Sequence, residues 1–180
     1  MKLFLDAFLP RLFPGLQFLC VAHEGKSDLE ASIPRKLRGW NEPGARFVVV
    51  RDSDGGDCQA VKEQLRGRCR EGGRGETLVR IACQELEAWY LGDLEAVAEA
   101  YGAPAVAKLA SKAKFRDPDQ LRAPASELRR LVPEFQKLAG ARSLALVVSE
   151  ARNRSASFHA LLTGLRRLIE APGEGGHGDL

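Results

Sequence analysis

This sequence has few of the residues that mark a zinc site or a nucleophilic triad. Its 180 residues include four cysteines and three histidines, and no two cysteines form a C-x-x-C pair. That spacing argues against structural zinc, and scattered cysteines are typical of a protein that is kept reduced. The histidines have no sequence neighbours that suggest a triad. We therefore expect a cytoplasmic protein without zinc.

Long apolar runs are also absent. The most apolar stretch, residues 1–16, is interrupted by Asp6 and Arg11, and no small-residue cleavage site follows it. It therefore has the form of neither a membrane span nor a signal peptide, and we expect no membrane association. The formal net charge is only +3. A charge this small is compatible with a polyanionic partner but does not require one.

The overall composition is that of an ordinary globular domain, with 44% hydrophobic and 28% charged residues. A chain of this length buries roughly two thirds of its unfolded surface and needs only one core. We expect one domain over residues 1–171, with a sheet-bearing part at 1–92 and a helical part at 93–171. The glycine-rich tail, residues 172–180, is expected to be disordered.

Apolar spacing divides the first half into alternating helices and strands. The strand-like runs are residues 16–22, 47–51 and 77–83. A helical repeat at 3–12 precedes them, and a helix at 58–69 connects the last two runs. Another helix, beginning at Ser27 or near Ser32, connects the first two. This order, with short glycine-rich connections, predicts a small parallel α/β sheet with flanking helices.

After Asp93 every periodic segment is helical, and prolines separate the segments. The expected helices are residues 94–101, 105–112, 126–135, 141–151 and 157–169. The last one carries a continuous apolar stripe. The fold class is therefore α/β, followed by an all-helical C-terminal part.

Residues 46–57, RFVVVRDSDGGD, carry the strongest functional signal. On an extended chain Asp52 and Asp54 point to the same side, and the glycines after them allow a sharp turn. Open α/β sheets bind their ligands at the carboxyl ends of strands, and paired carboxylates favour Mg²⁺ or Mn²⁺. An acidic turn that caps the next helix through Asp57 needs one aspartate, not three. We predict a metal site at Asp52 and Asp54.

Acids beside the other strands are candidates for catalysis. Glu85 and Glu87 directly follow the third strand-like run. Glu85 at the strand end would face the same crevice and add a metal ligand, whereas a helix starting at Gln84 would point the two glutamates apart. We expect one functional glutamate, and either can fill the role. Glu24, after the first run, is equally compatible with a third ligand and with a surface acid.

Arg152, Arg154 and Ser155 precede the last expected helix. The free N–H groups at a helix start form an anion site, which makes these residues weak candidates for phosphate binding. Helix capping alone also explains the serine.

Several segments together resemble one family. They are GKSDL (25–29), LRGW (37–40), VVVRDSDGGDC (48–58), RIACQELEAWYLGD (80–93), DP (117–118) and NRSASF (153–158). They are similar to the uncharacterised bacterial family named domain of unknown function 4276, a Toprim-like group related to the nuclease domains of overcoming-lysogenisation-defect proteins. The resemblance covers nearly the whole chain. It implies a Toprim-like, Rossmann-like sheet in which Asp52 and Asp54 take the role of the DxD pair.

The start of the chain departs from that family pattern. Relatives open with a strand that ends in glutamates, before the helix that corresponds here to residues 4–13. The resemblance therefore implies either that the true start codon lies upstream or that this strand and its acid are missing. Without that strand, residues 47–50 must leave an apolar edge unpaired or pair with residues 16–22. We expect a poorly soluble or dimeric chain with weak catalysis.

Three functions remain open. The first is a Mg²⁺- or Mn²⁺-dependent, nuclease-like Toprim domain of a bacterial ATPase-linked (phage) defence system, in which Glu85 or Glu87 positions or deprotonates water. The second is an inactive, truncated domain that binds nucleic acid or an ATPase partner, because two aspartates alone make a weak Mg²⁺ site. The third is a haloacid-dehalogenase-like phosphatase with Asp52 as the nucleophile. That motif normally lies on the first strand and continues with threonine, where Gly56 stands here.

Overall fold

The aspartates of the DxD pair lie at the end of a short parallel sheet. In the computed structural model, which describes residues 1–171, β1 (Val48–Asp52) pairs in parallel with β2 (Leu78–Ala82). The first residues of the two strands lie opposite each other. Helix α3 (Cys58–Glu71) makes the crossover that a parallel pair requires. The predicted small parallel α/β sheet is confirmed, and it has two strands over the described residues.

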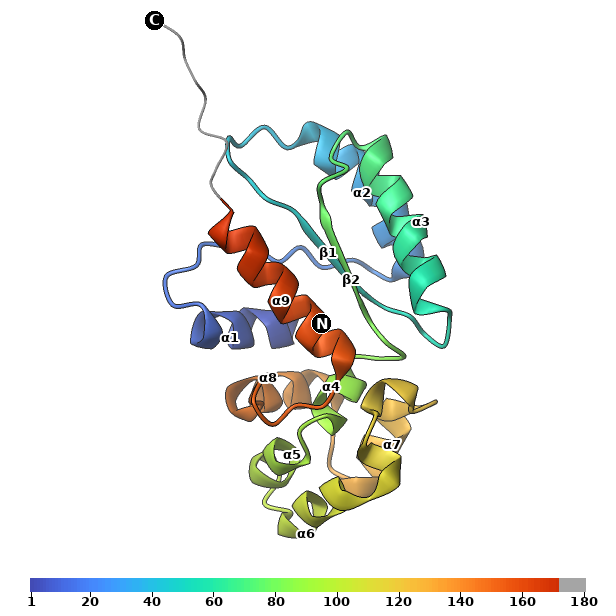
Figure 1. Cartoon of the computed structure of the whole chain (residues 1–180), viewed down its shortest axis with the longest axis vertical. Helices are drawn as coiled ribbons and strands as arrows, with labels where there is room; N and C mark the ends of the chain where they lie inside the picture. The colour runs from blue at the N-terminus through green and yellow to red at the C-terminus, as the bar shows by residue number, and fades with distance from the viewer. Residues whose placement is uncertain (172–180) are drawn as a thin grey trace, which may run out of the picture.

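Helices cover both faces of this sheet (Figure 1). Helices α2 (Lys26–Gly39) and α3 lie on one face, and α9 (Ala156–Glu170) crosses the other beside α1 (Lys2–Leu12). The side chains buried between the sheet and the first pair of helices are Ile33, Leu37, Val49, Leu65, Cys69, Val79 and Ile81. The sheet is therefore enclosed on both faces, as expected for strands rich in valine and isoleucine.

A larger core joins α1, the end of β2 and the helical half. Its centre is a group of buried aromatic side chains, in which the Phe158 ring lies 5.6 Å from the ring of Trp89 and 5.4 Å from the ring of Phe8. Phe4 and Tyr90 complete the group, with their rings 5.4 Å apart. The helical half therefore packs at the carboxyl ends of the strands, next to the DxD pair (Figure 1).

The helical half is built from short helices. They are α4 (Glu87–Leu91), α5 (Leu94–Ala100), α6 (Pro104–Ala107), α7 (Pro124–Leu131) and α8 (Lys137–Val147), with 3-10 turns η1 (Lys108–Ser111), η2 (Ala113–Phe115) and η3 (Pro118–Gln120) between α6 and α7. The predicted helix at 105–112 is thus divided into α6 and η1. The helices predicted at 126–135 and 141–151 are shifted toward the N-terminus.

Residues 16–22 do not form a strand, so this prediction was wrong. Phe18, Leu19 and Val21 in this segment are 39%, 71% and 47% exposed. An apolar segment becomes a strand only where a neighbouring strand accepts and donates its hydrogen bonds. Neither β1 nor β2 pairs with this segment.

Helix α2 begins at Lys26, not near Ser32. Gly25, with φ 137°, precedes it, and no side chain caps its first turn. Pro34 lies inside the helix. Of the two expected starts, Ser27 lies one residue from the observed start, and α2 continues through the proline.

Over the described residues the edge of β1 away from β2 is unpaired, which is one of the two alternatives expected for this strand. The Phe47 carbonyl accepts a hydrogen bond from Leu78 N–H at 2.9 Å, and Ser53 N–H donates to the Ala82 carbonyl at 3.0 Å. Because alternate residues turn toward β2, the backbone groups between them face the other edge. They belong to Val48, Val50 and Asp52. No strand of the described residues covers them, and the Val48 side chain is 36% exposed.

Over residues 1–171, none of the helices has both the length and the apolar character needed to cross a bilayer. The tail predicted to be disordered, residues 172–180, lies outside the described residues.

Candidate functional site

The carboxyl ends of both strands share an unusual backbone conformation. Asp54 and Gln84 have φ values of 49° and 67°, in the left-handed region that residues other than glycine rarely adopt. Asp54 N–H donates to the Gln84 carbonyl at 2.9 Å, and Gln84 N–H donates to Ser53 Oγ at 2.8 Å. Strain of this kind persists only where the surroundings fix it, and it is concentrated at functional sites. The DxD segment is thus tied to the segment that carries Glu85 and Glu87.

Asp52 is half-buried, and one of its carboxylate oxygens, Oδ1, is buried without a donor within residues 1–171. No hydrogen bond reaches its buried Oδ1 from any described residue. Burial raises the pKa of Asp52 to about 7, because it disfavours the charged form. The positive amino terminus lowers this pKa, whereas the carboxylates of Glu87, Asp54 and Glu85 raise it further. A buried acid among other acids is unfavourable unless a cation neutralises it. The structure therefore brings the sequence-predicted acids within electrostatic range of one another. We call Asp52, Asp54, Glu85 and Glu87 the acidic cluster.

Asp54 is the exposed member of the acidic cluster. Its Oδ2 lies 3.8 Å from Nζ of Lys26, in the first turn of α2. The sequence analysis did not select Lys26. Both groups are about half exposed, and an ion pair of this kind is weak enough for a metal ion to replace.

The helical half holds the two glutamates. Glu85 precedes α4, and its Oε2 accepts a hydrogen bond from Ala125 N–H, in the first turn of α7, at 2.8 Å. Glu87 begins α4, is only 4% exposed, and has Oε1 at 3.7 Å from Nζ of Lys137. Glu85 is only partly buried, so it is the glutamate that can reach solvent.

Tyr90 places a second unpartnered polar group beside the acidic cluster. Its side chain is fully buried, and no described residue forms a hydrogen bond with its hydroxyl. Burial raises the pKa of this hydroxyl, and the charges of Glu87 and Asp52 raise it further. The sequence analysis did not select Tyr90, although it belongs to the segment ELEAWY.

The acidic cluster does not bring three metal ligands together on its own. No group of three or more histidine, cysteine, aspartate or glutamate side chains within residues 1–171 is arranged to hold a metal ion. Glu85, predicted as a ligand beside the aspartates, is held by α7. Asp52 and Asp54 are therefore the candidate ligands that the chain supplies.

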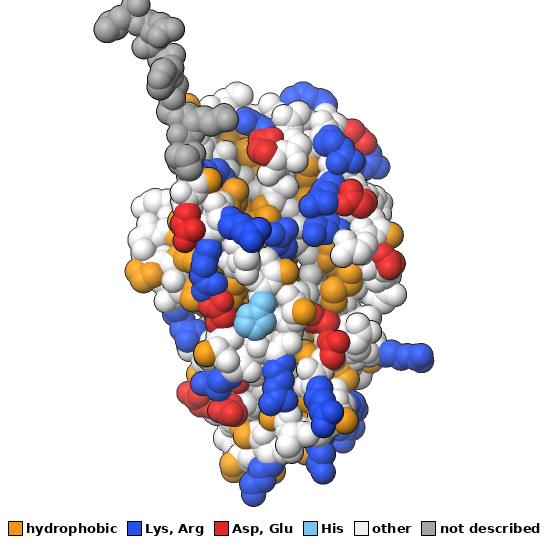
Figure 2. All heavy atoms as spheres, in the orientation of Figure 1, with side chains coloured by type: hydrophobic (Ala, Val, Ile, Leu, Met, Phe, Trp, Pro, Cys, Tyr) orange, Lys and Arg blue, Asp and Glu red, His pale blue; other side chains and the backbone are white. Residues whose placement is uncertain are grey.

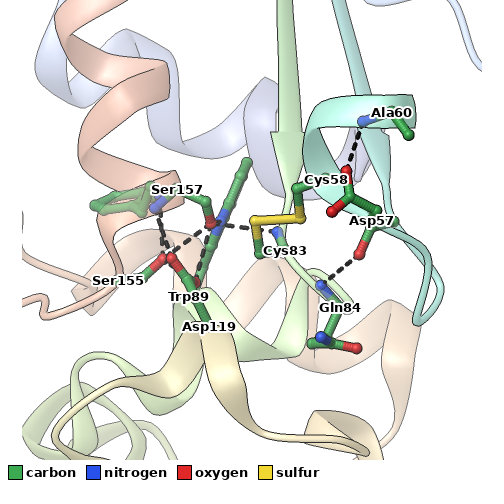
Figure 3. The surroundings of a disulfide bond; sticks show 11 residues. Asp57, Cys58, Ala60, Cys83, Gln84, Trp89, Asp119, Ser155 and Ser157 are labelled. Atoms are coloured by element: carbon green, nitrogen blue, oxygen red, sulfur yellow. Dashed lines mark hydrogen bonds between the residues drawn. A yellow bond between two sulfur atoms is a disulfide. The ribbon is translucent and has the colours of Figure 1, made fainter. Parts of the chain in front are cut away.

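A buried carboxylate holds the start of α9. Asp119 Oδ1 accepts hydrogen bonds from Ser155 Oγ at 2.7 Å and Ser157 Oγ at 3.0 Å, and its Oδ2 accepts one from Ser157 N–H at 2.7 Å (Figure 3). Ser155 Oγ also caps the helix by accepting a hydrogen bond from Phe158 N–H at 3.1 Å. Trp89 Nε1 donates to Ser157 Oγ at 2.8 Å. These contacts occupy the groups that a phosphate would need.

The two arginines suggested for phosphate binding also have internal partners. Arg152 donates to both carboxylate oxygens of buried Asp93 at 3.0 Å. Arg154 donates to the carbonyl of Ala110. Both arginines therefore connect the loop before α9 to the helical half, and Ser155 beside them is fully buried.

Cys58 and Cys83 form a disulfide between the start of α3 and the end of β2, with their Cα atoms 6.1 Å apart (Figure 3). Cys20 and Cys69 are free. The sequence analysis expected only unpaired cysteines. The pairing was missed because crossover packing, not sequence spacing, brings the two residues together across 25 positions.

We expect the oxidised protein to have only two titratable thiols under denaturing, non-reducing conditions. Closing a loop of 25 positions stabilises the folded state by about 3 kcal/mol. Dithiothreitol should therefore lower the melting temperature of the wild type, whereas Cys58→Ser should melt at a temperature that reductant does not change. Four titratable thiols in air-oxidised protein would contradict the pairing.

Comparison with known proteins identifies one family. The family model described as "Domain of unknown function (DUF4276)" matches residues 1–166. Searches of curated proteins and of solved structures give no match.

Proposed function

The chain belongs to the DUF4276 family, and on this premise we propose that it is a divalent-metal-dependent, nuclease-like enzyme that cleaves phosphodiester bonds. The observation that carries the proposal is the buried Oδ1 of Asp52, which has no donor among residues 1–171 and lies among other carboxylates. The proposal includes the Toprim-like relation suggested by the sequence segments and a cytoplasmic role in an ATPase-linked defence system.

The residues of the acidic cluster fit a hard cation. Asp52 has an oxygen without a partner, and Asp54 is exposed and only loosely paired with Lys26. Carboxylate oxygens of this kind suit Mg²⁺ or Mn²⁺, so Asp52 and Asp54 would hold the ion. When bound, such an ion polarises a phosphate oxygen and stabilises the charge that develops there.

The two glutamates have different roles in this proposal. Glu85 is partly exposed, and the hydrogen bond from Ala125 leaves its Oε1 available to accept a proton from the attacking water. Glu87 is buried beside Lys137, so its charge acts on Asp52 rather than on solvent. Glu85 is therefore the candidate general base.

We expect cleavage of labelled DNA or RNA to require Mg²⁺ or Mn²⁺ and to stop in EDTA. Asp54→Asn removes a ligand and Glu85→Gln removes the base, and each should lower the rate by about 100-fold or more. Glu99→Gln removes an equal charge from an exposed position on α5 and should have no effect. Cleavage that persists in EDTA, or that both active-site variants retain, would overturn the proposal.

An inactive binding module is the second candidate, because no three ligands are gathered within residues 1–171. It predicts that nucleic acid, or an ATPase partner, binds without cleavage under every metal condition. A haloacid-dehalogenase-like phosphatase needs an accessible, charged nucleophile. Asp52 has a buried oxygen and a pKa raised to about 7, mainly by burial, which does not favour that reaction.

A further inference from the structure

A groove of about 510 Å³ opens beside the acidic cluster, between the first turns of α3 and α9. Lys62 on α3, Arg80 on β2 and Ala160 on α9 line it. Gln84, which bonds to the backbone of Asp54, forms part of its wall. The groove therefore reaches from a basic surface to the end of the strand that carries the DxD pair.

Arg80 is fixed in this groove without an acidic partner. Its Nε donates to the Ala160 carbonyl at 2.8 Å, and its Nη1 donates to the Val79 carbonyl at 2.9 Å. Gly164 makes room for the guanidinium, because a Cβ at this position would lie 2.5 Å from Arg80 Nη2. No carboxylate of residues 1–171 forms an ion pair with Arg80. Its positive charge is therefore held in place but not neutralised.

Other basic side chains add to this charge. Burial lowers the pKa of Arg80, and the charges of Arg66 and Arg167 lower it further. Burial also lowers the pKa of Lys62, together with the charges of Arg66 and Arg80. Of these four cations, only Arg66 has an ion-pair partner over the described residues, Glu63 at 2.6 Å. Figure 2 shows lysine and arginine side chains gathered over α3 and α9.

Three acids also line the groove, and none of them forms an ion pair with these cations within residues 1–171. Asp57 caps α3 by accepting a hydrogen bond from Ala60 N–H at 2.7 Å, and Asp119 is used by Ser155 and Ser157. Asp117 is exposed and forms no ion pair within residues 1–171. Lys62 and Arg80 therefore have no ion-pair partner within residues 1–171, although three aspartates also line the groove, and unpaired cations of this kind attract an anion.

We propose that this groove binds the phosphodiester backbone of a nucleic acid, with Arg80 as the fixed phosphate contact and Lys62 and Arg167 as flanking contacts. The direction of the bound strand, toward Asp52 and Asp54, rests on the proposed function. A polymer fits better than a single phosphate because Lys62 and Arg80 line an open groove from two separate elements, and the charge of Arg167 on α9 acts on Arg80 from outside the lining residues. The amide side chains of Gln59 and Gln120 in the same groove can bond to bases or sugars.

The test measures binding in EDTA, so that cleavage plays no part. A fluorescein-labelled 20-nucleotide DNA, single-stranded or duplex, is titrated with the full chain at several salt concentrations, and binding is followed by anisotropy. Lys62→Gln and Arg167→Gln should each weaken binding by about three- to tenfold and lower the salt slope by about 0.7 to 0.9. Arg142→Gln, an exposed arginine on α8, should change neither quantity.

Gly164→Ala is the sharpest variant, because it keeps every charge. The added Cβ must displace the Arg80 guanidinium, so we expect about a tenfold loss of affinity that approaches the loss in Arg80→Gln. Circular dichroism and melting curves show whether each variant is folded, and Lys62→Gln and Arg167→Gln remain informative if Arg80→Gln is not. Wild-type affinity in Lys62→Gln, Arg167→Gln and Gly164→Ala would overturn the inference.

The remaining outcomes separate this inference from the proposed enzyme. Groove-dependent binding without cleavage in Mn²⁺ supports the inference and overturns the catalytic proposal. Cleavage in Mn²⁺ that the groove variants leave unchanged supports the catalytic proposal and overturns the inference. Tighter binding to phosphatidylserine vesicles or to a phosphopeptide than to DNA and RNA would also overturn the inference.

Discussion

Replacing Asp119 with alanine is expected to destabilise the protein by about 3–5 kcal/mol, enough to unfold many domains of this size. Asp119 is buried and accepts hydrogen bonds from Ser155 Oγ, Ser157 Oγ and Ser157 N–H. Without it Ser157 N–H and at least one of the two hydroxyls remain buried and unpaired, and each such group costs about 1–3 kcal/mol. Urea denaturation of the purified variant measures the loss.

Asp117→Ala is the matched control, because it removes an exposed acid two positions away. It should change the free energy of unfolding by less than about 0.5 kcal/mol. Asp119→Asn keeps the shape but replaces an accepting oxygen with a donor, so we expect a loss between those of the two alanine variants. An Asp119→Ala protein within about 1 kcal/mol of the wild type would show that the network does not hold the start of α9.

In contrast, replacing Asp52 with asparagine is expected to stabilise the metal-free protein at pH 8. Mainly through burial, the folded-state pKa of Asp52 is raised from 3.8 to about 7. The folded state therefore binds this proton more tightly than the unfolded state does, and stability is lost as the pH rises from about 4 to about 7. At about 1.4 kcal/mol per pKa unit, the loss is about 4 kcal/mol above pH 7.

The Asp52→Asn variant has no such proton to lose. In EDTA it should be more stable than the wild type above pH 7, and the difference should shrink as the pH falls and vanish below about pH 4. Mn²⁺ should stabilise the wild type and leave Asp52→Asn unchanged, because a ligand stabilises only a state that binds it. Equal stability of the two proteins from pH 4 to pH 8 would contradict the raised pKa of Asp52.

The two strands of the sheet could be predicted because their signal is local. Three consecutive valines in β1 and four apolar residues out of five in β2 favour strands that are buried on both faces. Residues 16–22 carry a similar local signal, yet they form no strand. Whether a neighbouring strand is present to pair with them depends on the rest of the fold, and a local pattern does not contain that information.

The candidate site could be predicted only in part, because some of its residues carry a local sequence signal and the others do not. Asp52 and Asp54 follow directly from the strand and the glycines, whereas Tyr90 and the cationic groove depend on packing between distant segments. Ser155 suggested an anion site because a serine before a helix is visible in sequence. The carboxylate that occupies its hydroxyl comes from Asp119, 36 positions away, and only the fold brings the two together.

The most direct test of the account is an anomalous difference map from crystals of the full chain soaked in Mn²⁺. We predict one strong peak at the carboxyl end of β1, bonded to carboxylate oxygens of Asp52 and Asp54, and no peak there in crystals of Asp52→Asn. A wild-type map without a peak at these two aspartates, or with the ion bound elsewhere, would contradict the proposed metal site.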